Sequence, residues 1–137
     1  MPLNIPQTFA ARPAELPLVH RWILSRTAAA IDGVRSGLDE YRFNDVASAN
    51  YQFVWHEFCD WYLEWIKADL FSKDEKAKND ARGVLLMVLE TVLKLMHPIT
   101  PFVTEEIWSV LPGERPTLML QPFPERREQW IDPAAEE

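Results

Sequence analysis

Two groups of side chains in this 137-residue sequence have types and spacings that could support chemistry. The first is His56, Cys59 and Asp60, which stand at positions i, i+3 and i+4, so a helix would bring them to one side as potential metal ligands. The zinc-binding helix of metalloproteases needs a second His four residues after the first, and here that position is Asp60. We therefore interpret His56 as a helix-packing residue in reach of Asp60, and the sequence predicts no metal site.

The second group is the adjacent pair Glu105 and Glu106. Successive helical residues point about 100° apart, so the two carboxylates cannot converge on one bond as general acid and base. The helix dipole, which favours acidic side chains near a helix start, explains them better. The 4 glycines are not clustered, and no glycine-rich phosphate loop or nucleophile elbow occurs. We therefore predict no catalytic residue and no cofactor-binding residue in this chain.

A third group is suited to RNA and lies on the first predicted helix. Trp22 stands beside Arg21 and four residues before Arg26. Guanidinium groups bind phosphates, and an indole ring can stack on a base. We take these three residues, with Arg35 and Arg42, as the RNA-binding candidates. The alternative is that Trp22 packs against another helix or another domain.

The overall charge argues against a nucleic-acid-binding protein, but the distribution of charge softens that conclusion. The formal net charge is −7. Residues 1–43 contain five Arg and four acidic residues, whereas residues 44–71 contain five acidic residues against Lys67 alone. Any RNA-binding surface is therefore expected on the first helix, and not on the second helix or the acidic C-terminal segment. DNA is not expected as a partner.

Composition indicates a single cytoplasmic globular domain. Hydrophobic residues make up 47% of the chain and charged residues 26%. Cys59 is the single cysteine, so an internal disulfide is excluded. No apolar run approaches the ~20 residues that a membrane-spanning helix needs. We expect no membrane partner.

Helical periodicity dominates the sequence and predicts an all-α fold. Residues 1–15 contain three prolines and are expected to be an irregular lead-in. A first helix is predicted from Leu16 to about Gly37. Its apolar positions and its polar face fall on opposite sides of a helical wheel: Val19, Ile23, Ala30, Val34 and Leu38 against Arg21, Ser25, Asp32 and Ser36.

A second helix, capped by Asn44, is predicted to continue to about Leu70. Its wide apolar face is typical of a helix with several neighbours. The residues on that face are Val46, Ala47, Tyr51, Val54, Phe58, Trp61, Trp65 and Ala68, with Phe53 and Tyr62 at its margins.

Two more helices are predicted from their end signals. Ser72 and Glu75 form an S-x-x-E capping box that opens the third helix, and this helix must end before Pro98. Thr100 and Pro101 are the N-cap and first-turn proline of the fourth.

Short connections make successive helices antiparallel neighbours. We therefore expect an up-and-down helical bundle of about four main helices over residues 16–124, with Thr117–Gln121 as a short extended segment near its end. Residues 125–137 are expected to form a polar, flexible tail, in which Trp130 is the one residue suited to dock on the bundle.

Four stretches of the sequence together resemble one protein family. They are HRWILSR at 20–26, YQFVWHEFCDWYLE at 51–64, HPITPFVTEEIW at 97–108 and MLQPFP at 119–124. Their order and spacing are similar to the anticodon-binding helical domain of class I aminoacyl-tRNA synthetases for branched aliphatic amino acids. The last three stretches resemble the valyl-tRNA synthetases in particular. His20 departs from the pattern, because the family usually has Asp there.

The resemblance implies a non-catalytic part of a longer enzyme. In such enzymes a Rossmann-type domain uses ATP and Mg²⁺ to activate valine, an inserted domain edits threonine, and the helical domain docks on the anticodon stem-loop of tRNA(Val). The nucleotide-site motifs of the HIGH and KMSKS kinds do not occur here, so the resemblance transfers no catalytic residue to this chain. A preceding helix supplies much of the anticodon contact in the family, so we expect the chain alone to bind tRNA weakly.

A second interpretation stays open. The bundle could be chiefly a structural scaffold that braces the catalytic core and the C-terminal arm of the parent enzyme, with little direct RNA contact. The acidic second helix and the net charge favour this alternative.

Overall fold

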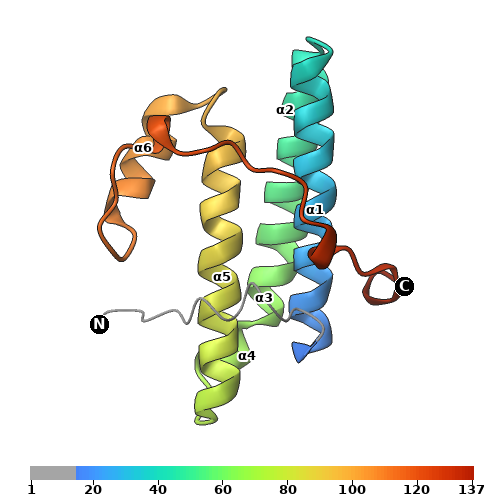
Figure 1. The fold of residues 1–137 in the computed structure, drawn as a ribbon. Coiled ribbons are helices and arrows are strands. Elements are labelled where there is room, and N and C mark those ends of the chain that lie inside the picture. Colours follow the sequence, from blue (N-terminus) through green and yellow to red (C-terminus); the bar gives the residue numbers. More distant parts are fainter. Residues whose placement is uncertain (1–14) are drawn as a thin grey trace.

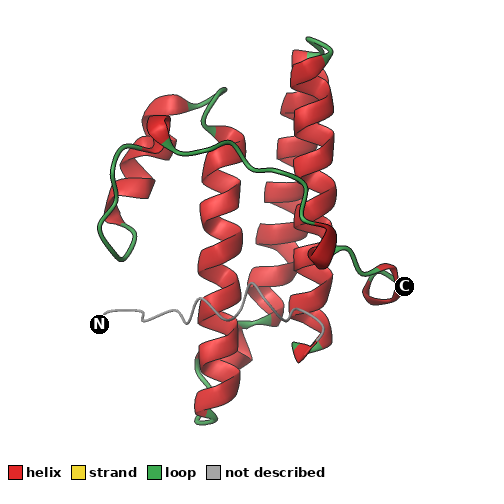
Figure 2. Cartoon of the chain, viewed as in Figure 1, coloured by secondary structure: helices red, strands yellow, loops and turns green. Residues whose placement is uncertain are grey.

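The computed structural model describes residues 15–137, so the predicted lead-in over residues 1–15 lies outside the described residues except for Glu15. All regular structure in the described part of the chain is helical, as Figure 2 shows. The main elements are α1 (Leu18–Asp39), α2 (Phe43–Tyr51), η3 (Gln52–Tyr62), α3 (Leu63–Trp65), α4 (Lys67–Leu70), α5 (Glu75–Met96) and α6 (Pro101–Val110). The predicted all-α class is confirmed.

The helices form an up-and-down bundle (Figure 1). The elements from α2 to α4 follow one another as a single rod beside α1, and α5 then returns along the bundle. After α6 the chain crosses α5 and reaches α1. Three short 3-10 helices mark this last segment: η4 (Leu118–Leu120), η5 (Glu128–Trp130) and η6 (Pro133–Ala135). The first lies within the stretch that we predicted to be extended.

Apolar side chains from α1, the α2–α4 rod and α5 fill one main core. Its fully buried members are Ile23, Leu24, Val34, Val46, Tyr62, Ile66, Val84, Val88 and Leu95. A second, smaller core joins α5 to α6 through Leu93, Trp108 and Leu118. None of the helices in the described residues is long and apolar enough to cross a membrane.

The start of α5 differs from its prediction. Asp74, not Ser72, is the N-cap, and its carboxylate accepts a hydrogen bond from the backbone N–H of Lys76 at 3.0 Å. Ser72 instead accepts the backbone N–H of Asp74 at 3.0 Å. Because Glu75 is then the first helical residue, it cannot reach back as the third residue of a capping box. Thr100 and Pro101 do start α6 as predicted.

The π-helix η3 changes which face of the second rod is buried. Hydrogen bonds in a π-helix join residues five apart, so each turn holds more residues than an α-helical turn. Phe53 and Phe58 are five residues apart and both buried, and Tyr62 follows them into the core. The buried face that we predicted with α-helical spacing was therefore partly wrong, because five of its members are exposed: Ala47, Tyr51, Trp61, Trp65 and Ala68.

The turn between α1 and α2 brings the two helices very close at Gly37. A Cβ atom at this position would lie 2.6 Å from Cγ2 of Val46, which is fully buried. Gly33, one turn earlier on α1, faces Ala49, and a Cβ atom there would lie at an ordinary 3.7 Å. Substitution by alanine is therefore expected to change the stability of the fold in opposite directions at the two glycines.

We predict that Gly37→Ala lowers the free energy of unfolding by about 1–3 kcal/mol, because the added methyl group overpacks the contact with Val46. Gly33→Ala is the matched control, and it should raise stability by up to about 1 kcal/mol, since alanine favours helix and finds room. Urea denaturation followed by circular dichroism measures both. Equal effects of the two substitutions would contradict the close approach of α1 and α2.

His20 links α1 to η3 inside the core. Its Nδ1 lies 2.9 Å from the Tyr62 hydroxyl, and both side chains are buried. Burial lowers the pKa of His20 below its usual value, although Asp69 and Asp80 act in the opposite direction. Burial likewise raises the pKa of Tyr62. The residue that departs from the family pattern is therefore a packed core residue.

Candidate nucleic-acid interface

The candidate RNA-binding residues of α1 already have partners within the chain. Nη1 of Arg21 donates to Oδ2 of Asp132 at 3.1 Å, and its Nε is buried without a partner. Asp132 belongs to the C-terminal segment, which we did not expect to lie against α1. Its backbone N–H donates to the Ser25 hydroxyl at 3.0 Å.

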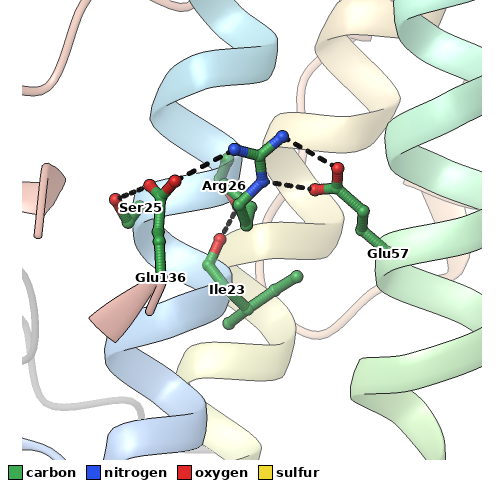
Figure 3. Close-up of polar contacts among 6 residues, drawn as sticks. Ile23, Ser25, Arg26, Glu57 and Glu136 are labelled. Carbon is green, nitrogen blue, oxygen red and sulfur yellow. Dashed lines mark hydrogen bonds and ion pairs between the residues drawn. The ribbon is translucent and has the colours of Figure 1, made fainter. Parts of the chain in front are cut away.

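Arg26 joins three parts of the fold (Figure 3). Its guanidinium group donates two hydrogen bonds of 2.9 Å to the Glu57 carboxylate on η3. A third hydrogen bond, of 3.1 Å, reaches Oε2 of Glu136, and the Ser25 hydroxyl donates to the other oxygen of that carboxylate. The bonds to Glu57, which outweigh the effect of burial, raise the pKa of Arg26. Arg26 therefore connects α1, η3 and the C-terminal segment.

Arg35 and Arg42 differ in their partners. Nη1 of Arg35 donates to the carbonyl oxygen of Pro124 at 2.9 Å, and its guanidinium carbon lies 5.9 Å from the centre of the Phe123 ring. Arg42 lies between two carboxylates, Glu40 at 3.0 Å and Asp45 at 2.9 Å. Of the four candidate arginines, Arg35 is the one whose hydrogen-bond partner is neutral.

Trp22 packs against another helix, which is the alternative that the sequence left open. Its ring lies 5.3 Å from the ring of Trp65 on α3 in an edge-on arrangement, and Trp65 lies 5.5 Å from Trp61. We call these three residues the tryptophan face. Trp61 and Trp65 stay about half exposed, with Asp60 and Glu64 next to them in the sequence and also exposed. Carboxylates of this kind repel the phosphates of RNA.

The C-terminal segment is packed on the bundle over part of its length. Trp130 is 4% exposed and belongs to the main core, and Ala135 is buried as well. Next to them in the sequence, Asp132 pairs with Arg21 and Glu136 pairs with Arg26. The division of the chain into lead-in, bundle and tail stays a prediction.

The structure also brings together cations that we did not single out. Lys94 on α5 lies near Arg115 and Arg127, and each of the three lies over a tryptophan ring: Lys94 and Arg115 over Trp108, Arg127 over Trp130. A cavity of about 320 Å³ adjoins them and is lined by Lys94, Arg126 and Arg127, among others. Lys94 is an isolated cation within the apolar run of α5, and residues 126 and 127 are the one pair of adjacent arginines. These two features of the sequence are the ones that could have indicated this group of cations.

The rejected metal and catalytic candidates have structural partners. Nδ1 of His56 lies 3.4 Å from Oδ2 of Asp60, which is the contact that we predicted. Both oxygens of Glu105 accept the backbone N–H of Leu118, at 3.1 and 3.0 Å, and so tie α6 to η4. Among residues 15–137, no three His, Cys, Asp or Glu side chains are placed to hold a metal ion.

Comparison with known proteins identifies the family. The chain is 65% identical over 124 residues to the valine–tRNA ligase of Desulfotalea psychrophila, an alignment that covers 90% of this chain and 14% of that protein. It is 50% identical over 106 residues to the valine–tRNA ligase of Syntrophotalea carbinolica, covering 77% and 12%. With the enzyme of Carboxydothermus hydrogenoformans the identity is 49% over 121 residues, covering 88% and 14%.

The chain therefore spans between 12% and 14% of the length of these relatives. Its residues 20–137 match the family described as the anticodon-binding domain of tRNA ligase. This agrees with the resemblance drawn from the four sequence stretches and with the all-helical fold. The chain thus belongs to the family of anticodon-binding domains of tRNA ligases.

Proposed function

We propose that this chain binds the anticodon arm of tRNA(Val) and that it does so as part of a valine–tRNA ligase. The observation that carries the proposal is the family match over residues 20–137, supported by the three valine–tRNA ligases that are 49–65% identical to it. On this proposal the chain positions the tRNA, while ATP-dependent charging with valine takes place in other domains of the longer protein. The same family membership leads us to propose a cytoplasmic location.

The described residues do not fit the ATP and Mg²⁺ of such an enzyme. Phosphates of ATP are held by glycine-rich backbone loops, whereas the 4 glycines of this chain are scattered. No trio of metal-ligating side chains gathers among residues 15–137. We therefore assign no ATP or Mg²⁺ chemistry to these residues.

For the contact surface we propose α1, with Arg21, Trp22, Arg26 and Arg35, together with Arg42 at the start of α2. An RNA phosphate would have to displace carboxylates from Arg21, Arg26 and Arg42. Arg35 contacts a backbone carbonyl and the Phe123 ring but no carboxylate, so it can turn to a phosphate without leaving an unpaired carboxylate behind. Within this group we therefore expect Arg35 to contribute most to RNA binding.

A titration of the labelled tRNA(Val) anticodon stem-loop with the 137-residue chain tests the proposal. We expect saturable binding by fluorescence anisotropy, weakened about ten-fold or more between about 50 and 150 mM salt if three phosphates are contacted. Arg35→Gln should weaken binding about five-fold. The matched control is Arg82→Gln, which removes the same charge from α5 and should leave binding unchanged. Lack of saturable binding at low salt, or equal binding of an unrelated hairpin, would contradict the proposal.

A second candidate function is a scaffold that braces the other domains of the parent enzyme. The tryptophan face favours it, because large apolar side chains stay about half exposed beside carboxylates that repel RNA. Two more aromatic side chains, Tyr51 at the end of α2 and Trp55 on η3, are also more than half exposed, with their rings stacked 6.3 Å apart. If the anticodon stem-loop does not bind at low salt, this second function becomes the better explanation.

A further inference from the structure

We propose that the cavity between α1, α5 and the segment after Gln121 binds a phosphate group through Lys94 and Arg127. The further statement that this group is a backbone phosphate of the anticodon arm rests on the proposed function. Lys94 and Arg127 are not among the five candidates on α1 and at the start of α2.

The shape of the cavity suits a small anion. Its volume is about 320 Å³, and three elements that are far apart in the sequence contribute to its walls: Ile31 from α1, Thr91 and Lys94 from α5, and residues 122–127. Figure 1 shows this last segment crossing α5 on its way to α1. Ile31 and Phe123 supply apolar wall, while Lys94, Arg126 and Arg127 supply N–H donors. An ammonium and a guanidinium group together can bind several oxygens of one phosphate.

Two of the three cations have no carboxylate partner. Among the described residues, Lys94 and Arg127 make no ion pair. The ammonium group of Lys94 lies 5.8 Å from the centre of the Trp108 ring, and the guanidinium carbon of Arg127 lies 5.5 Å from the centre of the Trp130 ring. Arg126 is shared between Asp32 at 3.5 Å and Glu128 at 2.8 Å. Lys94 and Arg127 are therefore the cations that are available to an anion.

The nearby carboxylates do not neutralise this pair. Glu90 is held by Nη2 of Arg115 at 2.6 Å, so its charge is already matched. Glu125 also lines the cavity, but its side chain is exposed and makes no ion pair among residues 15–137. The residues that line the cavity therefore include three cations, Lys94, Arg126 and Arg127, against one carboxylate, Glu125. The excess of charge in the cavity is positive.

The electrostatic state of Lys94 points the same way. Burial lowers the pKa of Lys94, Glu90 opposes that effect, and the nearby charges of Arg127 and Arg115 lower the pKa further. A half-buried cation such as Lys94 that is repelled by neighbouring cations is stabilised when an anion binds beside it. A phosphate in the cavity would supply the negative charge that these cations lack within the fold.

The first experiment uses inorganic phosphate as the probe and NMR spectra of the ¹⁵N-labelled chain as the readout. We expect the amide signals of Phe123, Glu125, Arg126 and Arg127 to shift in a saturable way with phosphate, but not with sodium chloride at equal ionic strength. Lys94→Met should weaken this binding at least ten-fold, whereas Lys94→Arg should retain it within about three-fold because the charge remains. Lys76→Met is the matched control, since it removes the same charge from an exposed position of the same helix.

The second experiment repeats the stem-loop titration with the same variants. Lys94→Met should weaken RNA binding and reduce the slope of log K against log salt by about one phosphate contact. Should Lys94→Met disturb folding, as judged by its thermal melt, Arg127→Gln gives the same test from an exposed side chain. Phosphate shifts that persist in both variants would overturn the site.

The two proposals can fail separately. If phosphate binds through Lys94 and the stem-loop does not bind at all, the site stands as a site for free phosphate and the RNA-binding function fails. If the stem-loop binds equally well to wild type, Lys94→Met and Arg127→Gln, the function stands and the assignment of this site to the RNA backbone fails.

Discussion

Replacing Trp130 with alanine is expected to lower the free energy of unfolding by about 3–5 kcal/mol, the usual cost of removing a buried tryptophan side chain. Trp130 is 4% exposed and packs in the main core, although it comes from the polar C-terminal segment. Its loss should also release Asp132 and Glu136 from Arg21 and Arg26. Urea denaturation monitored by far-UV circular dichroism measures the change.

Two further variants calibrate this result. Trp55→Ala removes a tryptophan that is 57% exposed and should cost less than about 1 kcal/mol. Trp130→Phe should cost clearly less than Trp130→Ala, because it keeps an aromatic ring in the core and loses no hydrogen bond, since Nε1 of Trp130 is buried without an acceptor. If Trp130→Ala costs no more than Trp55→Ala, the C-terminal segment is not packed on the bundle in solution.

Arg26→Met is expected to destabilise the fold by about 2–3 kcal/mol, a value between those for exposed and buried ion pairs. The Glu57 side chain is only 14% exposed, so removal of the guanidinium group leaves a largely buried carboxylate without its partner. A double-mutant cycle with Glu57→Gln should give a coupling energy of about 1–3 kcal/mol. The cycle requires only denaturation curves of four proteins.

Arg42→Met is the matched control for this prediction. Arg42 also pairs with two carboxylates, but its side chain is 49% exposed, so water screens the interaction. We expect a cost below about 1 kcal/mol. Equal costs for Arg26→Met and Arg42→Met would mean that the connection from α1 to η3 and the C-terminal segment adds nothing beyond a surface ion pair.

Local end signals predicted the boundary between α5 and α6 correctly, whereas the prediction that Asn44 caps the second helix was wrong, because Arg42 is the N-cap of α2 and Asn44 lies inside it. Thr100 and Pro101 start α6, and α5 ends at Met96, ahead of Pro98. Both signals act through the backbone of adjacent residues, so they do not depend on the rest of the fold. The predicted starting cap of α5, Ser72, was wrong, because Asp74 has a similar capping preference and is the residue that caps the helix.

The face that the second rod buries could not be predicted from α-helical spacing. The π-helical stretch η3 rotates the residues that follow it, so Tyr62 and Ile66 enter the core while Trp61 and Trp65 turn outward. No residue type in Gln52–Tyr62 marks a π-helix. The pattern of apolar residues is nearly continuous there and is compatible with either period.

The candidate interface was predicted only as a set of residue types. The proximity of Arg21, Trp22 and Arg26 follows from helical spacing, but their partners come from Trp65, Asp132 and Glu136, at the other end of the sequence or on another helix. The group of cations that lines the cavity also could not be predicted from the net charge of sequence segments. Lys94 and Arg127 are far apart in the sequence, and acidic residues close to each of them cancel their charge when the net charge of a segment is counted.

The attachment of the C-terminal segment to α1 has a consequence for the order in which the protein forms on the ribosome. The bundle consists of sequential antiparallel neighbours, so most of its contacts have low sequence separation and can form as each helix emerges. The contacts of Ser25 with Asp132 and Glu136 instead close loops of 107 and 111 residues, at an entropic cost of about 4 kcal/mol by the logarithmic law. They can form only after residue 136 has been synthesised. During translation, α1 therefore emerges before the other helices described here and is the last of them to be covered, and a chain that stops short of Trp130 leaves part of this core exposed to solvent.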